Sequence, residues 1–218
     1  MVENRFGKIN LEGEDLVVLP EKALYWEGKK SLIIADTHIG KADHFRKAGL
    51  PIPDQASTVD YCTLDTLLET YDVDRIIIVG DMFHSNFNNA CSDFITWKNT
   101  KSLREVVLVK GNHDILGEKF YRDGGIVVYN EEYIESPYTF THKPPAVINH
   151  GYYISGHIHP AVRMGGKGRQ SLTLSCFIFG LKQALLPAFG SLTGKCIVLP
   201  EKSDKVFVIG SDKVFEVK

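Results

Sequence analysis

Apolar and polar residues follow two different patterns along this chain, and the change comes near residue 125. In the first part, short β-branched runs at Leu32–Ala35, Arg75–Val79 and Glu105–Val109 are typical of buried strands. Between them, apolar residues recur at helical spacing from Val59 to Tyr71, and the stretch Ala90–Lys101 is also predicted to be helical. This order of elements predicts a β-α-β-α-β unit.

Further elements flank this unit. The opening segment has β-like runs at Phe6–Leu11, Leu16–Leu19 and Ala23–Trp26, Asp54 can cap the first long helix, and Ile115–Tyr121 is predicted as a short helix. From Gly125 onward, short β-like runs are separated by Gly, Pro and Asp. These runs are Ile126–Tyr129, Tyr138–Thr141, Tyr152–Ser155, Ser171–Phe179, Lys205–Ile209 and Val214–Val217. The pattern predicts one compact α/β sandwich domain over residues 1–218.

The bulk properties exclude several classes of protein. A chain of 218 residues with 44% hydrophobic content can bury one substantial core. Neither a signal-like start nor an apolar run of roughly 20 residues occurs, so we expect a cytoplasmic protein without a membrane partner. The formal charge of −2 gives no global basic field, so a nucleic acid would be held by a local patch or through a metal centre. The four widely spaced cysteines are expected to be buried, reduced thiols.

Four short polar motifs carry the candidate chemistry. They are D-T-H at residues 36–38, G-D at 80–81, G-N-H-D at 111–114 and G-H-I-H at 156–159. The first three motifs directly follow predicted strands, and the carboxyl ends of strands are where open α/β sheets bind their ligands. Any one motif has an ordinary structural explanation as a turn or a helix cap, but the set together predicts a metal site.

Aspartate and histidine are ligands suited to manganese, iron, zinc and similar divalent ions. The two carboxylate oxygens of Asp81 make it the natural bridge between a pair of ions. In an extended segment, residues two apart point the same way, which predicts that Asp36 and His38 hold one ion together. By the same reasoning, His157 and His159 share one side of the chain and serve two neighbouring ions.

The four motifs, in this order, resemble the calcineurin-like metallophosphoesterase superfamily over the span from Asp36 to His159. The resemblance implies a four-layer αββα sandwich with two mixed β-sheets flanked by helices. It implies a first ion held by Asp36, His38, Asp81 and His159, and a second held by Asp81, Asn112, His142 and His157. For the histidine that follows the strand Tyr138–Thr141, His142 is favoured and His150 is the alternative.

The same resemblance implies a hydrolytic mechanism. Two ions roughly 3.5–4 Å apart would lower the pKa of a bridging water toward about 7, and hydroxide would then attack phosphorus in line with the departing oxygen. His113 is implied as the group that stabilises or protonates this oxygen, so His113 and Asp81 are the predicted catalytic residues. Manganese is the foremost candidate metal, and the ligand chemistry leaves iron, zinc and nickel open.

Basic residues near the motifs are candidates for contact with an anionic substrate. We name Lys41, Arg46 and His84 as possible substrate-binding residues, although a surface or structural role is an equal alternative for His84. The glycine-rich basic segment Gly165–Arg169 either faces the substrate or forms a solvated hairpin tip, and the hairpin is slightly favoured.

Longer matches narrow the resemblance. The segments D-T-H-I-G-K-A, G-D-M-F-H-S, V-K-G-N-H-D, G-H-I-H-P-A and L-P-A-F-G resemble bacterial ligase-associated DNA damage response endonucleases. This implies cleavage of DNA, single- or double-stranded, in DNA repair, and a functional association with a DNA ligase and a helicase. Two alternatives stay open: hydrolysis of a small phosphoester such as a cyclic nucleotide or a nucleotide, and a scaffold that has lost turnover.

Overall fold

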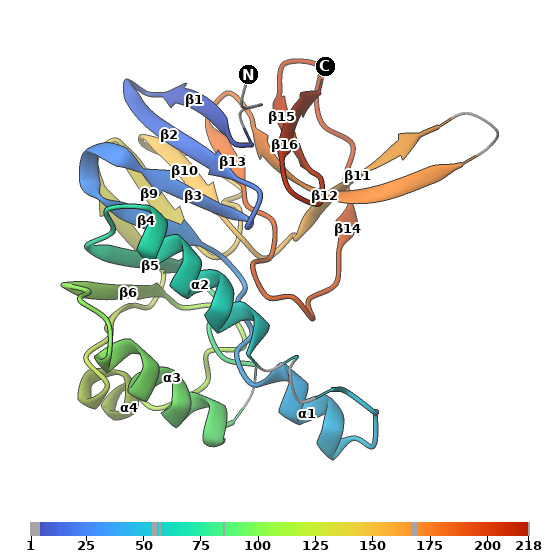
Figure 1. Cartoon of the computed structure of the whole chain (residues 1–218). Helices are drawn as coiled ribbons and strands as arrows, with labels where there is room; N and C mark the ends of the chain where they lie inside the picture. Colours follow the sequence, from blue (N-terminus) through green and yellow to red (C-terminus); the bar gives the residue numbers. More distant parts are fainter. Residues whose placement is uncertain (1–4, 54–55, 57, 85, 167–169, 218) are drawn as a thin grey trace.

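The computed structural model describes residues 5–53, 56, 58–84, 86–166 and 170–217. Within these ranges, two mixed β-sheets pack face to face and helices cover the outer face of the first sheet (Figure 1). The predicted α/β class, with two mixed sheets and flanking helices, is therefore confirmed. No helix in the described ranges is long and apolar enough to cross a membrane.

The first sheet has seven strands in sequence order. They are β1 (Gly7–Leu11), β2 (Glu14–Leu19), β3 (Ala23–Trp26), β4 (Ser31–Ile34), β5 (Arg75–Val79), β6 (Glu105–Val109) and β7 (Val127–Tyr129). Strands β1 to β4 are antiparallel, whereas β4 to β7 are parallel. Ile34 pairs with Ile78, and Ile78 pairs with Leu108, so the carboxyl ends of β4, β5 and β6 lie in line at one edge of the sheet.

Three helices bury apolar residues against this sheet. The helical elements are η1 (Glu27–Lys29), α1 (Lys41–Lys47), α2 (Val59–Thr70), α3 (Asn89–Asn99) and α4 (Glu118–Asp123). Leu67 of α2, Phe94 of α3 and Tyr121 of α4 join one apolar cluster with residues of β4, β5 and β6. Helix α1 stands apart from this layer, near the strand ends (Figure 1).

Some helix boundaries differ from the sequence prediction. The short helix predicted from Ile115 begins at Glu118, because the residues before it form the turn that carries the G-N-H-D motif. Helix α1 was not predicted, since K-A-D-H-F-R-K has no regular apolar spacing. The predicted cap residue Asp54 lies outside the described residues, and α2 begins after Thr58.

In the described ranges the second sheet has nine strands, and all of them come from the second half of the chain, which was predicted to be mostly β. They are β8 (Glu132–Glu135), β9 (Tyr138–Thr141), β10 (Tyr152–Ser155), β11 (Pro160–Gly165), β12 (Ser171–Phe179), β13 (Gln183–Leu185), β14 (Cys196–Ile197), β15 (Lys205–Ile209) and β16 (Val214–Val217). Strands β9 and β10 are parallel neighbours, so their carboxyl ends also lie side by side.

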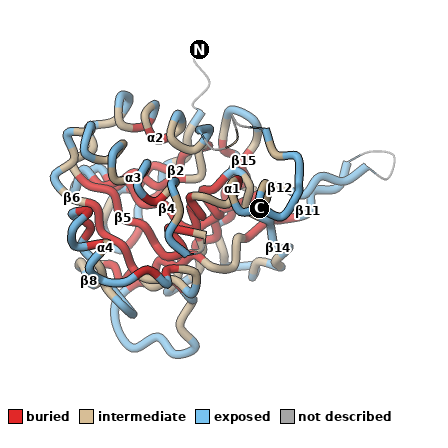
Figure 2. Tube along the Cα trace, turned by 90° about the horizontal axis from the view of Figure 1, so that it is seen from below, coloured by how far each residue is buried: buried red, intermediate tan, exposed pale blue. Residues whose placement is uncertain are grey.

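The main core lies between the two sheets, where buried segments run through the middle of the molecule (Figure 2). Trp26 of the first sheet meets Tyr138 of the second with ring centroids 4.8 Å apart. Along β12, Phe177 and Phe179 face this core, while Cys176 and Ile178 belong to a smaller cluster on the opposite face. Burying a large apolar side chain contributes about 1.5–3 kcal/mol, so this interface holds the two sheets, and the ligands at their edges, in a common position.

The prediction of four buried cysteines is wrong for two of them. All four thiols are free, but Cys62 and Cys196 are exposed, whereas Cys91 and Cys176 are buried. Cys62 lies on the solvent side of the amphipathic helix α2, and Cys196 lies on the short edge strand β14. Spacing along the sequence could not assign either residue to a face.

Candidate metal centre

Five loops bring the motif residues to one place. The loops after β4, β5 and β6 carry Asp36, Asp81 and Asn112, and the segments after β9 and β10 carry His142 and His157. The two sheets therefore contribute ligands from opposite sides of their shared core. Two groups of three side chains have ligand atoms that all lie within 4.8 Å of one another.

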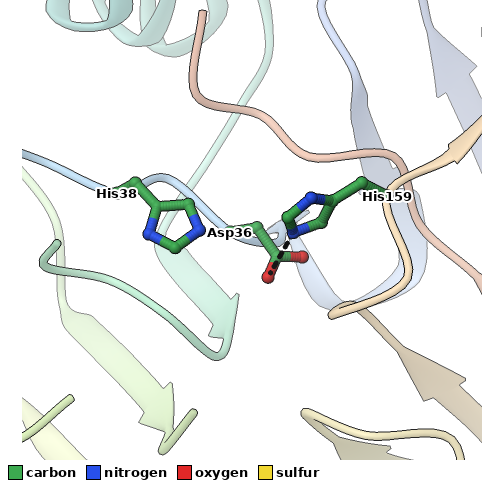
Figure 3. A group of neighbouring side chains, drawn as sticks. All are labelled: Asp36, His38 and His159. Carbon is green, nitrogen blue, oxygen red and sulfur yellow. Dashed lines mark ion pairs between the residues drawn. The ribbon is translucent and has the colours of Figure 1, made fainter. Parts of the chain in front are cut away.

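The first group contains Asp36, His38 and His159, from the loop after β4 and the segment before β11 (Figure 3). The Nε2 atom of His159 lies 3.1 Å from Oδ1 of Asp36. Both atoms are buried, and neither has a hydrogen-bond partner in the described part of the chain. A buried carboxylate oxygen without a partner is costly, so this pair has the character of a cation site.

The second group contains Asp81, His142 and His157. The Nε2 atom of His142 is 3.4 Å from Oδ2 of Asp81 and 3.0 Å from Nδ1 of His157. It is also 3.2 Å from Oδ1 of Asn112. On its other side, the Nδ1–H of His142 can donate to the carbonyl oxygen of Val79 at 3.4 Å, which leaves Nε2 with its lone pair directed to this group.

Asp81 lies between the two groups. Its Oδ1 accepts the backbone N–H of His113 at 2.8 Å. Its Oδ2 lies 3.8 Å from Nε2 of His38, in the first group, and 3.4 Å from Nε2 of His142, in the second. One oxygen thus faces both groups, which is the position required of a bridging ligand. The nitrogen and oxygen donors of the two groups fit a pair of divalent transition-metal ions.

The alternative histidine lies elsewhere. His150 is exposed in the loop between β9 and β10, and its ring lies 5.7 Å from that of Tyr153. His142, in contrast, is buried and within reach of both aspartates. The geometry therefore favours His142 over His150 as the histidine that completes the second group.

The backbone at the ligands differs from the extended geometry that we expected from residue spacing. Asp36, His38, Asp81, His157 and His159 have φ angles of 52°, 45°, 50°, 66° and 51°. These values belong to the left-handed region, where residues other than glycine are uncommon. The premise of extended chain is therefore wrong, although Asp36 and His38 still converge and His157 and His159 still serve different groups. Tight turns at the strand ends, and not strand pleating, direct these side chains.

Glycines beside the ligands make room for them. A Cβ atom on Gly80 would overlap the imidazole of His142, and one on Gly111 would overlap the carboxylate of Asp81. A Cβ atom on Gly156 would lie 2.5 Å from Oδ2 of Asp36. The glycines in three of the four motifs are therefore required by close packing around the ligands.

Two supporting features were missed by the sequence analysis. The carboxylate of Asp114 accepts the backbone N–H groups of Met82, Phe83 and Gly111 at 2.9, 3.2 and 2.9 Å, and so joins the loops after β5 and β6. Burial raises the pKa of Asp114 to about 7, and these hydrogen bonds oppose the increase. The acidic residue that ends the G-N-H-D motif was the signal that could have identified this role.

The second missed feature is the segment that follows β13 and contains Phe189 and Gly190, which we call the strap. The N–H groups of Phe189 and Gly190 donate to the carbonyl oxygens of Ala35 and Asp36 at 2.8 and 3.2 Å. A Cβ atom on Gly190 would overlap the carbonyl of Thr37. Phe189 is buried, and the L-P-A-F-G segment to which it belongs holds the loop that carries Asp36 and His38.

Burial keeps two of the proposed ligand imidazoles, those of His38 and His157, neutral. Burial lowers the pKa of His38 to about 2, and the positive charge of Lys41 contributes to the decrease. Burial also lowers the pKa of His157. A neutral imidazole has a free lone pair, so both residues are in the form that binds metal at neutral pH.

Around this centre lies a rim of histidines and basic residues. The ring of His113 stacks on that of His84 at 5.6 Å and 17°, and the ring of His38 lies 5.1 Å from His113. Burial, followed by the charge of Lys41, lowers the pKa of His84 to about 4. Burial lowers the pKa of Lys41 itself, while the carboxylates of Asp36 and Asp81 oppose that decrease. Lys41 and His84 therefore lie close to the centre.

The other basic candidates lie farther out. Arg46 pairs with Asp43 at 2.5 Å and donates to the carbonyl oxygens of Ile52 and Pro53 at 3.1 Å, so these contacts hold its own helix and loop together. Strands β11 and β12 form the predicted hairpin, which projects from the body of the molecule (Figure 1). Residues 167–169 of the predicted tip lie outside the described residues.

Comparisons with known proteins agree with this geometry. Residues 29–178 match the family model described as calcineurin-like phosphoesterase. The chain is also similar to a solved structure, titled crystal structure of Pseudomonas putida nuclease MPE, with 28% sequence identity and a TM-score of 0.78. That alignment covers 97% of this chain and 100% of the other. No curated protein matches the chain.

Proposed function

Because the chain belongs to the calcineurin-like phosphoesterase family, we propose that it is a dinuclear metal-dependent phosphodiesterase that cleaves DNA, an endonuclease with a role in DNA repair. The position of Asp81 carries this proposal. One carboxylate oxygen within 4 Å of a histidine from each group is the arrangement that two neighbouring ions need. The likeness to nuclease MPE over almost the whole chain supports a nucleic-acid substrate.

The ligand assignment follows the two groups. Asp36, His38, Asp81 and His159 would hold the first ion, and Asp81, Asn112, His142 and His157 the second. The buried, unpartnered Oδ1 of Asp36 and the neutral state of His38 support this fit. We propose manganese as the metal, since it accepts both carboxylate and imidazole ligands, and iron, zinc and nickel stay open.

Besides holding the ions, the protein's own residues would protonate the departing oxygen and attract the phosphate. When bound, the two ions supply a water-derived nucleophile at neutral pH and offset the charge of the phosphate. His113 is held by its backbone bond to Asp81, and its ring is positioned by His84, so it can deliver a proton to the departing oxygen. Lys41 would attract the phosphate, because its half-buried ammonium group lies close to the two aspartates.

A screen of metals against substrates tests the proposal. With Mn²⁺, purified protein is expected to hydrolyse bis(p-nitrophenyl) phosphate and to nick single- or double-stranded DNA. The Asp81→Ala variant should lose both activities, whereas Asp212→Ala, which changes an exposed aspartate near the carboxyl terminus, should retain them.

Three outcomes would change the assignment. Equal activity of Asp81→Ala and the wild type would contradict the metal mechanism. Strong turnover of cyclic nucleotides or nucleotides, with no cleavage of DNA, would indicate a small-molecule phosphoesterase. Absence of bound metal and of activity after reconstitution would indicate a scaffold without turnover. The cytoplasmic location and the association with a DNA ligase and a helicase stay predictions from family resemblance.

A further inference from the structure

A groove of about 500 Å³ lies between helix α1 and the loop that follows β5. Its walls are Asp43, Arg46, Lys47, Phe87, Asn88 and Asn89. The volume falls within the roughly 300–1,000 Å³ typical of small-ligand sites. None of these six residues belongs to the two ligand groups, so the groove is separate from the proposed ion sites.

Ring contacts lead from the metal centre toward this groove as far as His44 on helix α1. The ring of His84 lies 5.5 Å from that of His38, and the ring of His44 lies 4.8 Å from that of His84. Lys47 follows His44 by three residues on helix α1, so the two side chains lie on the same face, one turn apart. The groove wall at Lys47 therefore lies one helical turn beyond His44, on the side of the metal centre where His84 lies.

Phe87 gives the groove an exposed aromatic wall. Its side chain is 59% exposed, and its ring packs edge-on against Phe120 with the centroids 5.7 Å apart. The loop that carries it is held at both ends: the N–H of His84 donates to the carbonyl of Ile39 at 3.0 Å, and the side chain of Asn88 accepts the N–H of Ala90 at 2.9 Å. An exposed ring on an anchored loop is suited to stack against a planar base.

The charges in the groove favour a phosphate beside that base. The carboxylate of Asp43 is paired with Arg46, so its negative charge is offset within the wall. Lys47, the last residue of α1, is exposed and adds a positive charge beside Arg46. The exposed amide of Asn89 adds hydrogen-bond donors and an acceptor. An aromatic face, a lysine and an amide together match the base and phosphate of a nucleotide.

We propose that this groove is a subsite for the nucleotide next to the scissile phosphate, with its base stacked on Phe87 and its phosphate near Lys47. This inference rests on the proposed function, because it requires a nucleic-acid substrate. It adds a binding site outside the metal centre and names Phe87 as the residue that distinguishes a polynucleotide from a small phosphodiester.

The test compares two substrates of the Mn²⁺-loaded enzyme. The ratio of kcat/KM for a single-stranded oligonucleotide to kcat/KM for bis(p-nitrophenyl) phosphate should fall roughly 5- to 100-fold in Phe87→Ala, mainly through a higher KM. Phe87→Trp, which restores an aromatic face, should recover most of this ratio. Phe215→Ala is the matched control, since Phe215 is an exposed phenylalanine on β16, and it should leave the ratio unchanged.

A second measurement locates the base. With an oligonucleotide that contains one abasic position, the wild type should cut less often beside that position, and Phe87→Ala should show no such depletion. An unchanged substrate ratio in Phe87→Ala, or equal depletion in both proteins, would overturn the subsite while the nuclease assignment stands. Hydrolysis of bis(p-nitrophenyl) phosphate without cleavage of any oligonucleotide by the wild type would instead refute the DNA substrate, and the subsite with it.

Discussion

The metal centre and the groove beside it are built in opposite ways. The centre is buried, with Asp36 fully inaccessible and Asp81 only 2% exposed, and five of its seven proposed ligands lie on left-handed turns. The groove is open, with Phe87 59% exposed, and one of its walls is an ordinary helix. The difference separates two tasks: the centre has to hold charged groups in one geometry, whereas the groove has only to offer a surface along which a strand can lie.

The centre's geometry is energetically demanding. A non-glycine residue in the left-handed region costs roughly 1 kcal/mol or more, so the five ligands in this conformation cost on the order of 5 kcal/mol together. This is comparable to the whole net stability of an ordinary domain, which is about 5–15 kcal/mol. The hydrogen bonds of Asp114 and the strap at Phe189 and Gly190 are placed where they can offset that cost.

Among the variants that keep all the proposed metal ligands, the largest expected effect is at His113, whose ring lies beside those of His38 and His84. His113→Ala should lower kcat on DNA roughly 10²- to 10⁴-fold, the usual contribution of a general acid. The loss on bis(p-nitrophenyl) phosphate should be smaller, because p-nitrophenolate departs without a proton. Metal content by elemental analysis serves as the control, since the ring of His113 is not among the proposed ligands. Equal losses on both substrates would contradict the role in leaving-group protonation.

The next effect tests the close packing of the centre. Gly80→Ala should lower activity at least about 100-fold, because the added Cβ atom overlaps the imidazole of His142 and the residue has a φ of 80°. Gly194→Ala is the matched control, since no atom lies within 4 Å of its added Cβ. Kinetics together with bound-metal analysis would check this, and full activity of Gly80→Ala would show that His142 can move without penalty.

Addition of Mn²⁺ should raise the thermal stability of the protein, and this rise should depend on the metal centre but not on the groove. Mn²⁺ at about 100 times its Kd should stabilise the metal-free protein by about 2.7 kcal/mol for each ion bound, and each such increment corresponds to a rise in Tm of roughly 5–11 °C. Thermal unfolding with and without Mn²⁺ measures this shift. Asp81→Ala should show little or no shift, whereas Phe87→Ala should show the same shift as the wild type. A reduced shift in Phe87→Ala would mean that the groove and the centre are not independent.

The smallest effect is expected at Lys41. Lys41→Met should raise the KM for DNA by about 10-fold, because the variant removes one charged contact to phosphate. The slope of the logarithm of DNA affinity against the logarithm of salt concentration should also become shallower by about one, because one fewer counterion is released on binding. Lys202→Met, at an exposed site in the β14–β15 connection, is the control and should match the wild type. An unchanged KM and salt dependence in Lys41→Met would remove Lys41 from the substrate site.

The pattern of apolar residues along the chain predicted a strand correctly where that strand has a distinctive run of residues. Strands β5, β6, β9, β10 and β12 have the predicted bounds, because β-branched and aromatic runs between turn residues are distinctive. Helix α1 was missed because seven mostly polar residues have no apolar period, and in the fold its rings at His44 and Phe45 contact His84 in the loop after β5. Strands β13 and β14 were missed for a similar reason, since two or three residues are too short to show alternation.

For the site, the sequence by itself indicated which residues are candidates for the metal chemistry, because Asp, Asn and His that follow strands are suitable ligands for divalent ions. Only the tertiary structure decided how they meet. It brought His142 and not His150 to Asp81, and it replaced the expected extended segments with left-handed turns. It also placed Phe87 and Lys47 across a groove from each other. Contacts between residues so far apart along the chain depend on how the two sheets pack, which no local pattern encodes.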